Sequence, residues 1–170
     1  MRLAGGFRRG WAAALVIAAL LSGCAAFKAV EPRPGQDESS VLEALGRPTG
    51  TYALPEGRRL EFATGPYGRT TWMVDLDAGG RVVEARQVLT DSHLAAFQAR
   101  APGMTRDELL RTLGRPGERR GVGWQGGQTW SWRYVSNDCL WFQVSVDRAG
   151  IVQSAGFAID PACDAPSDRD

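Results

Sequence analysis

The chain has 170 residues, a formal net charge of +1 and 44% hydrophobic residues, which suits one or two small globular domains. Its basic residues are nearly all arginines, and Lys28 is the only lysine. Beyond the first residues the longest basic runs are arginine pairs, so the composition argues against a nucleic-acid-binding protein.

The N-terminal residues have the pattern of a secretory leader. Three arginines precede an uncharged apolar stretch at residues 11–21, which is too short to span a bilayer. Residues 21–24 read LSGC and resemble the bacterial lipobox, in which the leader is cut before a cysteine that carries lipid. We therefore predict a lipoprotein signal peptide at 1–23 and lipidation of Cys24. The alternative is an ordinary secretory signal with an incidental cysteine.

The residues after this leader predict where the protein is held. Residues 24–36 are small, polar and interrupted by prolines, as in a flexible tether. Ala25 stands where an aspartate would favour retention at the inner membrane in sorting of the enterobacterial type. We therefore expect an outer-membrane protein on the periplasmic face, with the lipid as a tether rather than a span.

Two further cysteines, Cys139 and Cys163, remain in the body of the chain. In an oxidising compartment such a pair usually forms a disulfide. Metal ligation and free thiols are the alternatives, but the sequence has one histidine and no CxxC motif. We predict the disulfide.

One motif occurs twice, at residues 35–48 (GQDESSVLEALGRP) and 103–116 (GMTRDELLRTLGRP). Each copy predicts a short helix with one apolar face, ended by a glycine with a proline two residues later. Asp37 is a candidate N-cap of the first helix, and the second copy has a capping box. Helices of about two turns are unstable alone, so each must dock on another element. The motif positions of the second copy are Gly103, Thr105, Glu108, Gly114 and Pro116.

Three strands are predicted after each copy of the motif, with turn signals between them. Residues 90–102 predict an additional helix ahead of the second copy. The strands are expected at 58–64, 69–77 and 80–89, and at 128–135, 139–147 and 150–159.

The expected fold is therefore α+β, with two tandem repeats. Each repeat is a short helix or helix pair followed by a three-stranded antiparallel meander. The first repeat is expected at 37–90 and the second at 91–163, with a disordered tail at 164–170. Each repeat alone has little core, so we expect the two to pack together.

Alternation along the strands predicts which residues are buried. A sheet with apolar and polar side chains on opposite faces is typically covered on one face only. We expect the inner set to include Trp72, Val74 and Leu76 in the first repeat, and Leu140, Phe142, Val144 and Val146 in the second.

Tryptophans are concentrated in the second repeat. Trp130 and Trp132 share one face of their strand, whereas Trp141 lies on the face of its strand opposite Phe142. Both faces cannot easily be core, so part of the group is a candidate partner-binding surface. The alternative is that the disulfide and the C-terminal tail cover these side chains. The candidate surface residues are Trp124, Trp130, Trp132 and Trp141.

Three patterns suggest chemistry, and each favours a structural interpretation. His93 lies on the helix between the motif copies and is predicted to be solvated. Residues 121–126 (GVGWQG) match GxGxxG, but a strand rather than a helix follows, so we predict a loop. Asp75 and Asp77 supply too few oxygen ligands for calcium and are expected in a hairpin. We predict no catalytic residues, no cofactor and no metal, and a protein that is not an enzyme.

Phe97, the motif at 103–116 and the strands after it resemble the SmpA/OmlA domain of the BamE-like outer-membrane lipoproteins. Counting both copies, the resemblance covers about residues 35–160. The first copy departs from it, with Gln36 and Asp37 in place of Met and Thr. A tandem of such units also looks like the β-lactamase inhibitory protein.

The resemblance implies a non-enzymatic lipoprotein that binds other envelope proteins, including the β-barrel assembly machinery, in outer-membrane assembly or maintenance. It implies contact with the membrane through the N-terminal lipid and none with nucleic acid. The alternative implied by the second resemblance is an inhibitor or sensor of a periplasmic enzyme.

Overall fold

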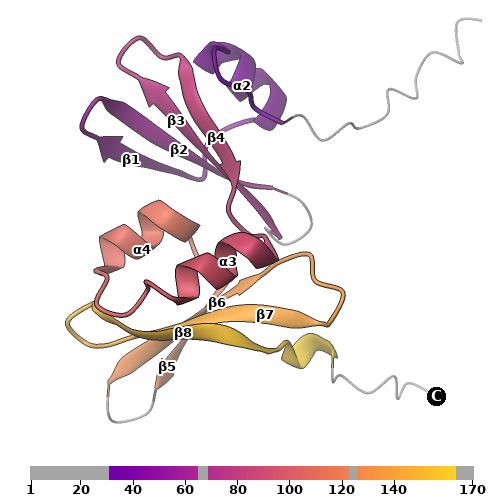
Figure 1. Cartoon of the computed structure of the whole chain (residues 1–170), viewed down its shortest axis with the longest axis vertical. Coiled ribbons are helices and arrows are strands. Elements are labelled where there is room, and N and C mark those ends of the chain that lie inside the picture. The colour runs from indigo at the N-terminus through magenta and orange to yellow at the C-terminus, as the bar shows by residue number, and fades with distance from the viewer. Residues whose placement is uncertain (1–30, 65–68, 123–125, 164–170) are drawn as a thin grey trace, which may run out of the picture. The chain divides into compact units, whose positions relative to one another are not determined.

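The computed structural model describes residues 31–64, 69–122 and 126–163. These belong to one compact unit, 31–170. The fold is α+β, with two four-stranded antiparallel sheets whose strands follow one another in chain order (Figure 1). The predicted signal peptide with Cys24, most of the tether, Trp124 and the C-terminal tail lie outside the described residues.

Each sheet has one strand more than the sequence analysis predicted, so the expectation of three-stranded meanders was wrong. The additional strands, β1 and β5, are five-residue edge strands, and β5 (ERRGV) has no apolar alternation. Pairing with a neighbour, rather than an intrinsic pattern, holds them as strands. The first sheet contains β1 (Gly50–Leu54), β2 (Gly57–Thr64), β3 (Thr70–Asp77) and β4 (Val82–Gln87), and the second contains β5 (Glu118–Val122), β6 (Gly127–Arg133), β7 (Leu140–Val146) and β8 (Val152–Ile159).

The two sheets repeat one another in detail. In each, the pairing of the last two strands shifts register once, between Asp75 and Leu76 and between Ser145 and Val146. In each, an isolated bridge joins the start of the motif helix to the end of the last hairpin turn. The bridged pairs are Asp37–Arg81 and Thr105–Ile151.

The described helices are α2 (Glu38–Leu45), α3 (Asp91–Gln98) and α4 (Arg106–Leu113). The capping box expected at α4 is present: the Thr105 side chain accepts from the Glu108 amide, and Glu108 accepts from the Thr105 amide. Asp37 occupies the N-cap of α2 without a side-chain capping bond. Both motif helices end at a glycine with positive φ, 80° at Gly46 and 77° at Gly114, a conformation that a β-carbon would disfavour.

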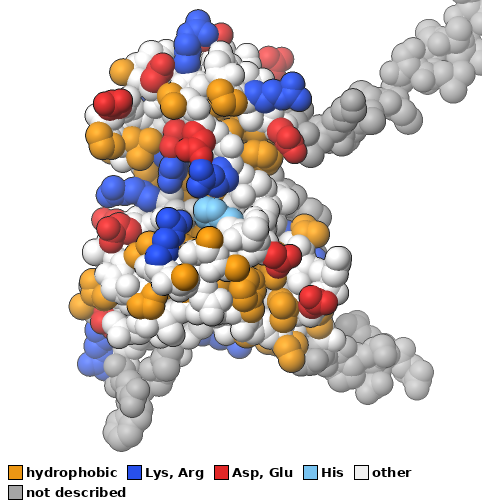
Figure 2. All heavy atoms as spheres, in the orientation of Figure 1, with side chains coloured by type: hydrophobic (Ala, Val, Ile, Leu, Met, Phe, Trp, Pro, Cys, Tyr) orange, Lys and Arg blue, Asp and Glu red, His pale blue; other side chains and the backbone are white. Residues whose placement is uncertain are grey.

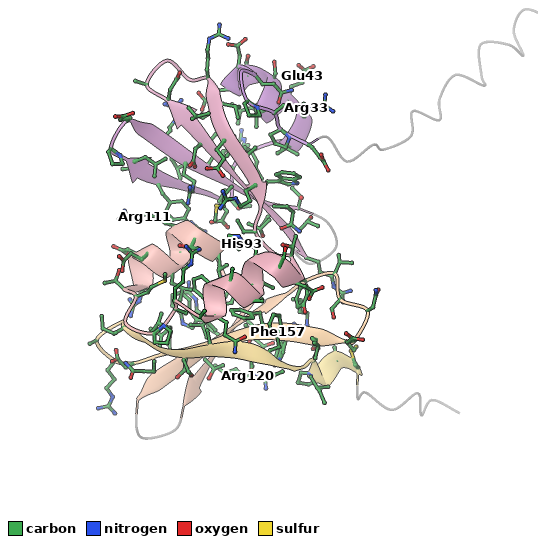
Figure 3. The ribbon with its side chains drawn as sticks, viewed as in Figure 1. Arg33, Glu43, His93, Arg111, Arg120 and Phe157 are labelled. Atoms are coloured by element: carbon green, nitrogen blue, oxygen red, sulfur yellow. A yellow bond between two sulfur atoms is a disulfide. The ribbon has the colours of Figure 1, made fainter. Side chains whose placement is uncertain are left out.

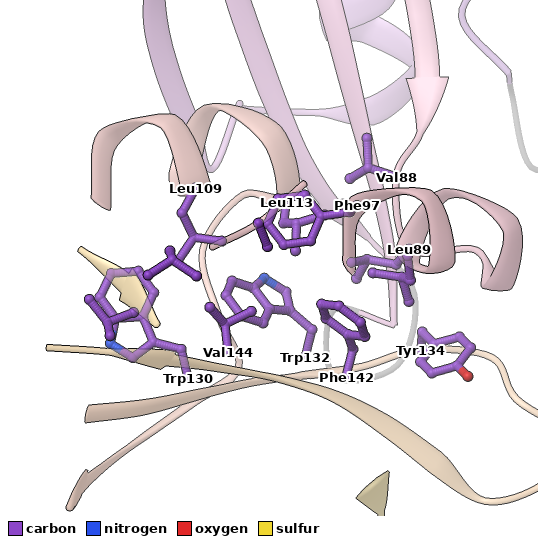
Figure 4. Close-up of a cluster of buried hydrophobic side chains, with 14 of the residues drawn as sticks. Val88, Leu89, Phe97, Leu109, Leu113, Trp130, Trp132, Tyr134, Phe142 and Val144 are labelled. Carbon is purple, nitrogen blue, oxygen red and sulfur yellow. The ribbon is translucent and has the colours of Figure 1, made fainter. Parts of the chain in front are cut away.

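The core of the second repeat lies between α3, α4 and one face of the second sheet. Phe97, Leu109 and Leu113 of the helices lie above side chains of the strands (Figure 4), and all are buried. Phe97 meets Phe142 edge to face, with 5.9 Å between the ring centres. The side chains shown beneath the helices come from β6, from the residue after it and from β7: Trp130, Trp132, Tyr134, Phe142 and Val144.

The tryptophans of the candidate partner surface are buried where the structure describes them, which contradicts a partner surface and agrees with the alternative that these side chains are covered. Trp130 and Trp132 are 1% exposed and Trp141 is 3% exposed. The helix pair covers the first two. Trp141 lies on the opposite face of the sheet, where the guanidinium groups of Arg133 and Arg120 lie 5.0 and 6.0 Å from its ring centre. Arginine stems and cation–π contacts thus cover an aromatic residue outside the main core.

The first sheet is covered on both faces. On one face, Val41 of α2 packs on a buried cluster of Leu60, Phe62, Val74, Leu76 and Val82, with Trp72 partly buried beside it. On the other face, Met73 belongs to the core cluster of the second repeat, together with Val88. The expectation that the two repeats pack together is therefore confirmed by a shared core.

A buried carboxylate joins the repeats beside this shared core. Glu61 of β2 is 0% exposed. Its Oε1 accepts from Thr49 Oγ1 at 3.0 Å and from the Arg115 amide at 3.1 Å, and its Oε2 accepts from Tyr52 Oη at 2.5 Å. Burial, and then the hydrogen bond to Glu61, raise the pKa of Tyr52, so the phenol keeps its proton as a donor.

Gly114, at the end of the second motif, fits against this carboxylate. A β-carbon at Gly114 would lie 2.9 Å from Glu61 Cδ and 3.1 Å from Met73 Cε. The Gly114 carbonyl accepts from Trp132 Nε1 at 3.3 Å. The motif glycine therefore contacts the first sheet and the second sheet at once.

We expect Glu61→Ala to lower the free energy of unfolding by about 3 kcal/mol, because it leaves three donors around a buried site without an acceptor. Urea denaturation measures the change. Glu56→Ala, in the exposed turn between β1 and β2, is the matched control and should stay within about 0.5 kcal/mol of wild type. Equal stabilities for the two variants would contradict a stabilising role for the network.

The predicted disulfide between Cys139 and Cys163 is present. It joins the residue before β7 to the end of η2 (Pro161–Cys163), a 3-10 turn that follows β8. Beside it, the Asp160 amide donates to the Cys139 carbonyl at 2.9 Å. Arg133 donates to both carboxylate oxygens of Asp160, at 2.6 and 2.9 Å. Covalent and ionic contacts therefore close this end of the second sheet.

Replacing both cysteines by serine should lower the free energy of unfolding by about 3 kcal/mol in the chain-entropy description, given their sequence separation of 24. Urea denaturation with and without reductant tests this. Reductant should destabilise the wild type and leave the double variant unchanged. A wild type that is insensitive to reductant after unfolding and refolding would contradict the expectation.

Candidate functional site

The candidate site is a charged cavity where the first sheet meets α3 and α4. Its volume is about 210 Å³. Figure 2 shows the single histidine at the surface among basic and acidic side chains. The first repeat supplies Arg59, Met73, Asp75, Glu84, Arg86 and Val88, and the second supplies His93, Arg100 and Thr112.

The cross-strand register of the first sheet brings these charges together. Arg59 of β2 lies opposite Asp75 of β3, which lies opposite Glu84 of β4. Arg86 lies opposite Met73. Since paired residues project from the same face of a sheet, all of them reach the face that meets the second repeat.

Arg59 is held in one position by three hydrogen bonds. Its Nε and Nη2 donate to the two carboxylate oxygens of Asp75, at 2.5 and 2.7 Å. Its Nη1 donates to the Arg111 carbonyl at 2.8 Å, in the last turn of α4, where a cation is favoured. The bond to Asp75 raises the pKa of Arg59. This bidentate pair is a rigid wall of the cavity.

The two remaining arginines differ in their partners. Arg86 forms an ion pair with Glu84 on the same strand. Arg100, just after α3, is exposed and takes part in none of the ion pairs found among the described residues. The cavity therefore has one guanidinium with its donors uncommitted.

His93 does not have the solvated environment that the sequence analysis predicted. It lies in the first turn of α3, where its amide donates to Thr90 Oγ1 at 3.3 Å. Its ring is half-buried, on the side of α3 that faces the first sheet (Figure 3). Its Nε2 is buried without a hydrogen-bond partner. Burial, followed by the charges of Arg86, Arg100 and Arg59, lowers its pKa, so the ring is neutral at pH 7.

The other sequence candidates fall outside this cavity or have structural roles in it. Asp77 caps the β3–β4 turn, accepting from the Arg81 amide at 2.9 Å, and Asp75 is bonded to Arg59. Of the 121–126 stretch, Gly121 lies in β5 and Gly126 directly precedes β6, and residues 123–125 are outside the described chain. Among the described residues, no group of three or more His, Cys, Asp or Glu side chains could hold a metal ion.

The arginines of the cavity were not singled out from the sequence. Arg59 and Arg86 lie on predicted strands, and the signal that could have marked them is their shared face with Asp75 and Glu84. That shared face can be recognised only once it is known which residues of neighbouring strands pair with one another. The cavity offers guanidinium groups, of which Arg59 is fixed by Asp75, and a neutral imidazole. These groups suit recognition of an anion.

Comparisons with known proteins leave the family open. No family model and no curated protein matches the chain. A solved structure, a DUF4309 family protein (YjgB) from Bacillus subtilis, covers 79% of this chain and 90% of its own at 11% identity. Its TM-score of 0.28 is too low to support an argument about fold or function. Among the described residues, no helix is long and apolar enough to cross a membrane.

The lowered pKa of His93 predicts a loss of stability on acidification. An unfolded histidine titrates near 6.5, so below that pH the unfolded chain binds more protons than the native protein. The contribution of the neutral His93 ring to the free energy of unfolding is therefore complete above pH 6.5. It is lost as the pH falls from 6.5 through the lower pKa of the folded state.

We expect the free energy of unfolding to fall between about pH 7.5 and about pH 5.5 in the wild type and to fall less in His93→Gln. Urea denaturation across this range checks the difference. Glu108 and Asp160 also have a lowered pKa. Their carboxyl groups change protonation at lower pH, so they do not contribute to the change in stability measured here. Parallel pH dependences in the two proteins would contradict the assignment.

Proposed function

We propose that this protein is a lipid-anchored outer-membrane protein that binds other proteins of the envelope and catalyses no reaction. The proposal of a lipid anchor is supported by the LSGC sequence at residues 21–24, which follows a short apolar stretch. The disulfide between Cys139 and Cys163 agrees with an oxidising compartment such as the periplasm.

The observation that carries the binding role is the fixed arrangement of charge in the cavity. The bidentate pair with Asp75 holds Arg59 in place, and the shared core fixes the strands that bear the charges relative to α3 and α4. A preorganised set of charges loses little entropy when a partner binds. A rigid recognition surface on a tethered body is the property that a BamE-like assembly or maintenance factor requires.

Lipidation is the first part to test. The mature wild-type protein, purified from membranes, should begin at Cys24 and have the mass of a lipidated chain, whereas Cys24→Ala should keep residues 1–23. Mass spectrometry of the intact proteins measures both. A wild-type protein cut elsewhere, with an unmodified Cys24, would contradict the lipid anchor and favour an ordinary secretory signal.

Partner binding is tested by crosslinking in membranes, detergent extraction and affinity capture. Subunits of the barrel-assembly machinery, crosslinked to residues around the cavity, are the expected result. A soluble periplasmic hydrolase in their place would favour the inhibitor alternative. Comparing wild type with Cys24→Ala separates contacts made by the folded body from those that depend on the lipid.

A further inference from the structure

The cavity beside His93 has an excess of positive charge. Three arginines line it against two carboxylates, Asp75 and Glu84, and the neutral His93 adds none. The lining therefore has a formal charge of about +1, since guanidinium groups remain protonated in proteins.

Among the charged groups of the lining, Arg100 has no partner among the described residues, whereas the other four are paired. Both oxygens of Asp75 already accept from Arg59, and Glu84 is paired with Arg86. Arg100 offers donors that no described carboxylate takes up. The buried Nε2 of His93 has no partner, although a buried polar atom normally has one. A ligand with acceptor oxygens would pair with Arg100, next to the His93 ring that also lines the cavity.

We propose that this cavity binds a carboxylate group, held by Arg100 beside the His93 ring. Arginine's planar set of donors suits the two coplanar oxygens of a carboxylate. A single negative charge balances the lining, whereas a doubly charged phosphate would leave excess negative charge beside Asp75 and Glu84.

The size of the cavity agrees with a small ligand group. Its 210 Å³ exceeds many times the roughly 15 Å³ that one water molecule needs. A carboxylate can therefore enter together with water. Both proposals use this cavity, but their tests are separate: carboxylate binding is measured on the purified protein, and partner binding is measured by capture from membranes.

The test uses the whole purified protein and two matched ligands, N-acetylglycine and its uncharged amide, N-acetylglycinamide. Titration followed by NMR of the His93 ring reports on the site itself. We expect saturable shifts of the His93 signals with N-acetylglycine, a rise in the His93 pKa on binding, and no response to the amide. Acetate should reproduce the effect if a free small carboxylate suffices, whereas binding of N-acetylglycine alone would identify the carboxyl terminus of a polypeptide as the source.

Arg100→Gln removes the free guanidinium and should weaken binding about tenfold, the loss expected for one hydrogen bond to a charged group. Arg47→Gln, after α2 and outside the cavity lining, is the matched control and should bind as the wild type does. Far-UV circular dichroism confirms that both variants are folded. Three results would each overturn the proposal. They are tighter binding of inorganic phosphate than of either carboxylate, equal effects of the two arginine variants, and NMR shifts confined to residues outside the cavity.

Discussion

The hydrogen bonds of Glu61 are the interaction on which the joined structure depends. A fully buried carboxylate is tolerated only when donors surround it. Thr49 and Tyr52 of the first repeat supply two donors, and the Arg115 amide at the second motif supplies the third. Separating the repeats would remove the Arg115 donor and uncover Glu61, which projects with Met73 from the face of the first sheet that meets the second repeat. The contact therefore fixes the position of the second motif on the first sheet.

The duplicated motif serves two different purposes because its copies have different surroundings. At Gly46 a β-carbon would meet nothing within 4 Å, whereas at Gly114 it would collide with Glu61. Gly46 is needed for its backbone conformation alone, and Gly114 also for close packing between repeats. The helix α2 covers the first sheet on one face, and α3 with α4 fills the space against the other. Duplication thus produced a two-sided sheet from a module that would be covered on one face.

The charged cavity is a consequence of this packing. The face of the first sheet that meets the helices bears Arg59, Asp75, Glu84 and Arg86 beside Met73, and full closure would bury those charges at high cost. The Arg59–Asp75 pair between strands and the Arg86–Glu84 pair within β4 neutralise these charges, and the opening keeps them in contact with water. Arg100 and His93, from the second repeat, complete a site that neither repeat contains alone.

Local signals in the sequence determined the repeat, the helix ends, most strands and the pairing of Cys139 with Cys163, because capping residues, turn glycines and alternation act over a few residues. They also marked Val74, Phe142 and Val144 as core. Tertiary structure decided the edge strands β1 and β5, the burial of Trp130, Trp132 and Trp141, and the environment of His93. Each of these depends on register and on contacts between residues far apart in the chain. A strand's neighbours, and the helices that cover it, are not encoded in its own residues.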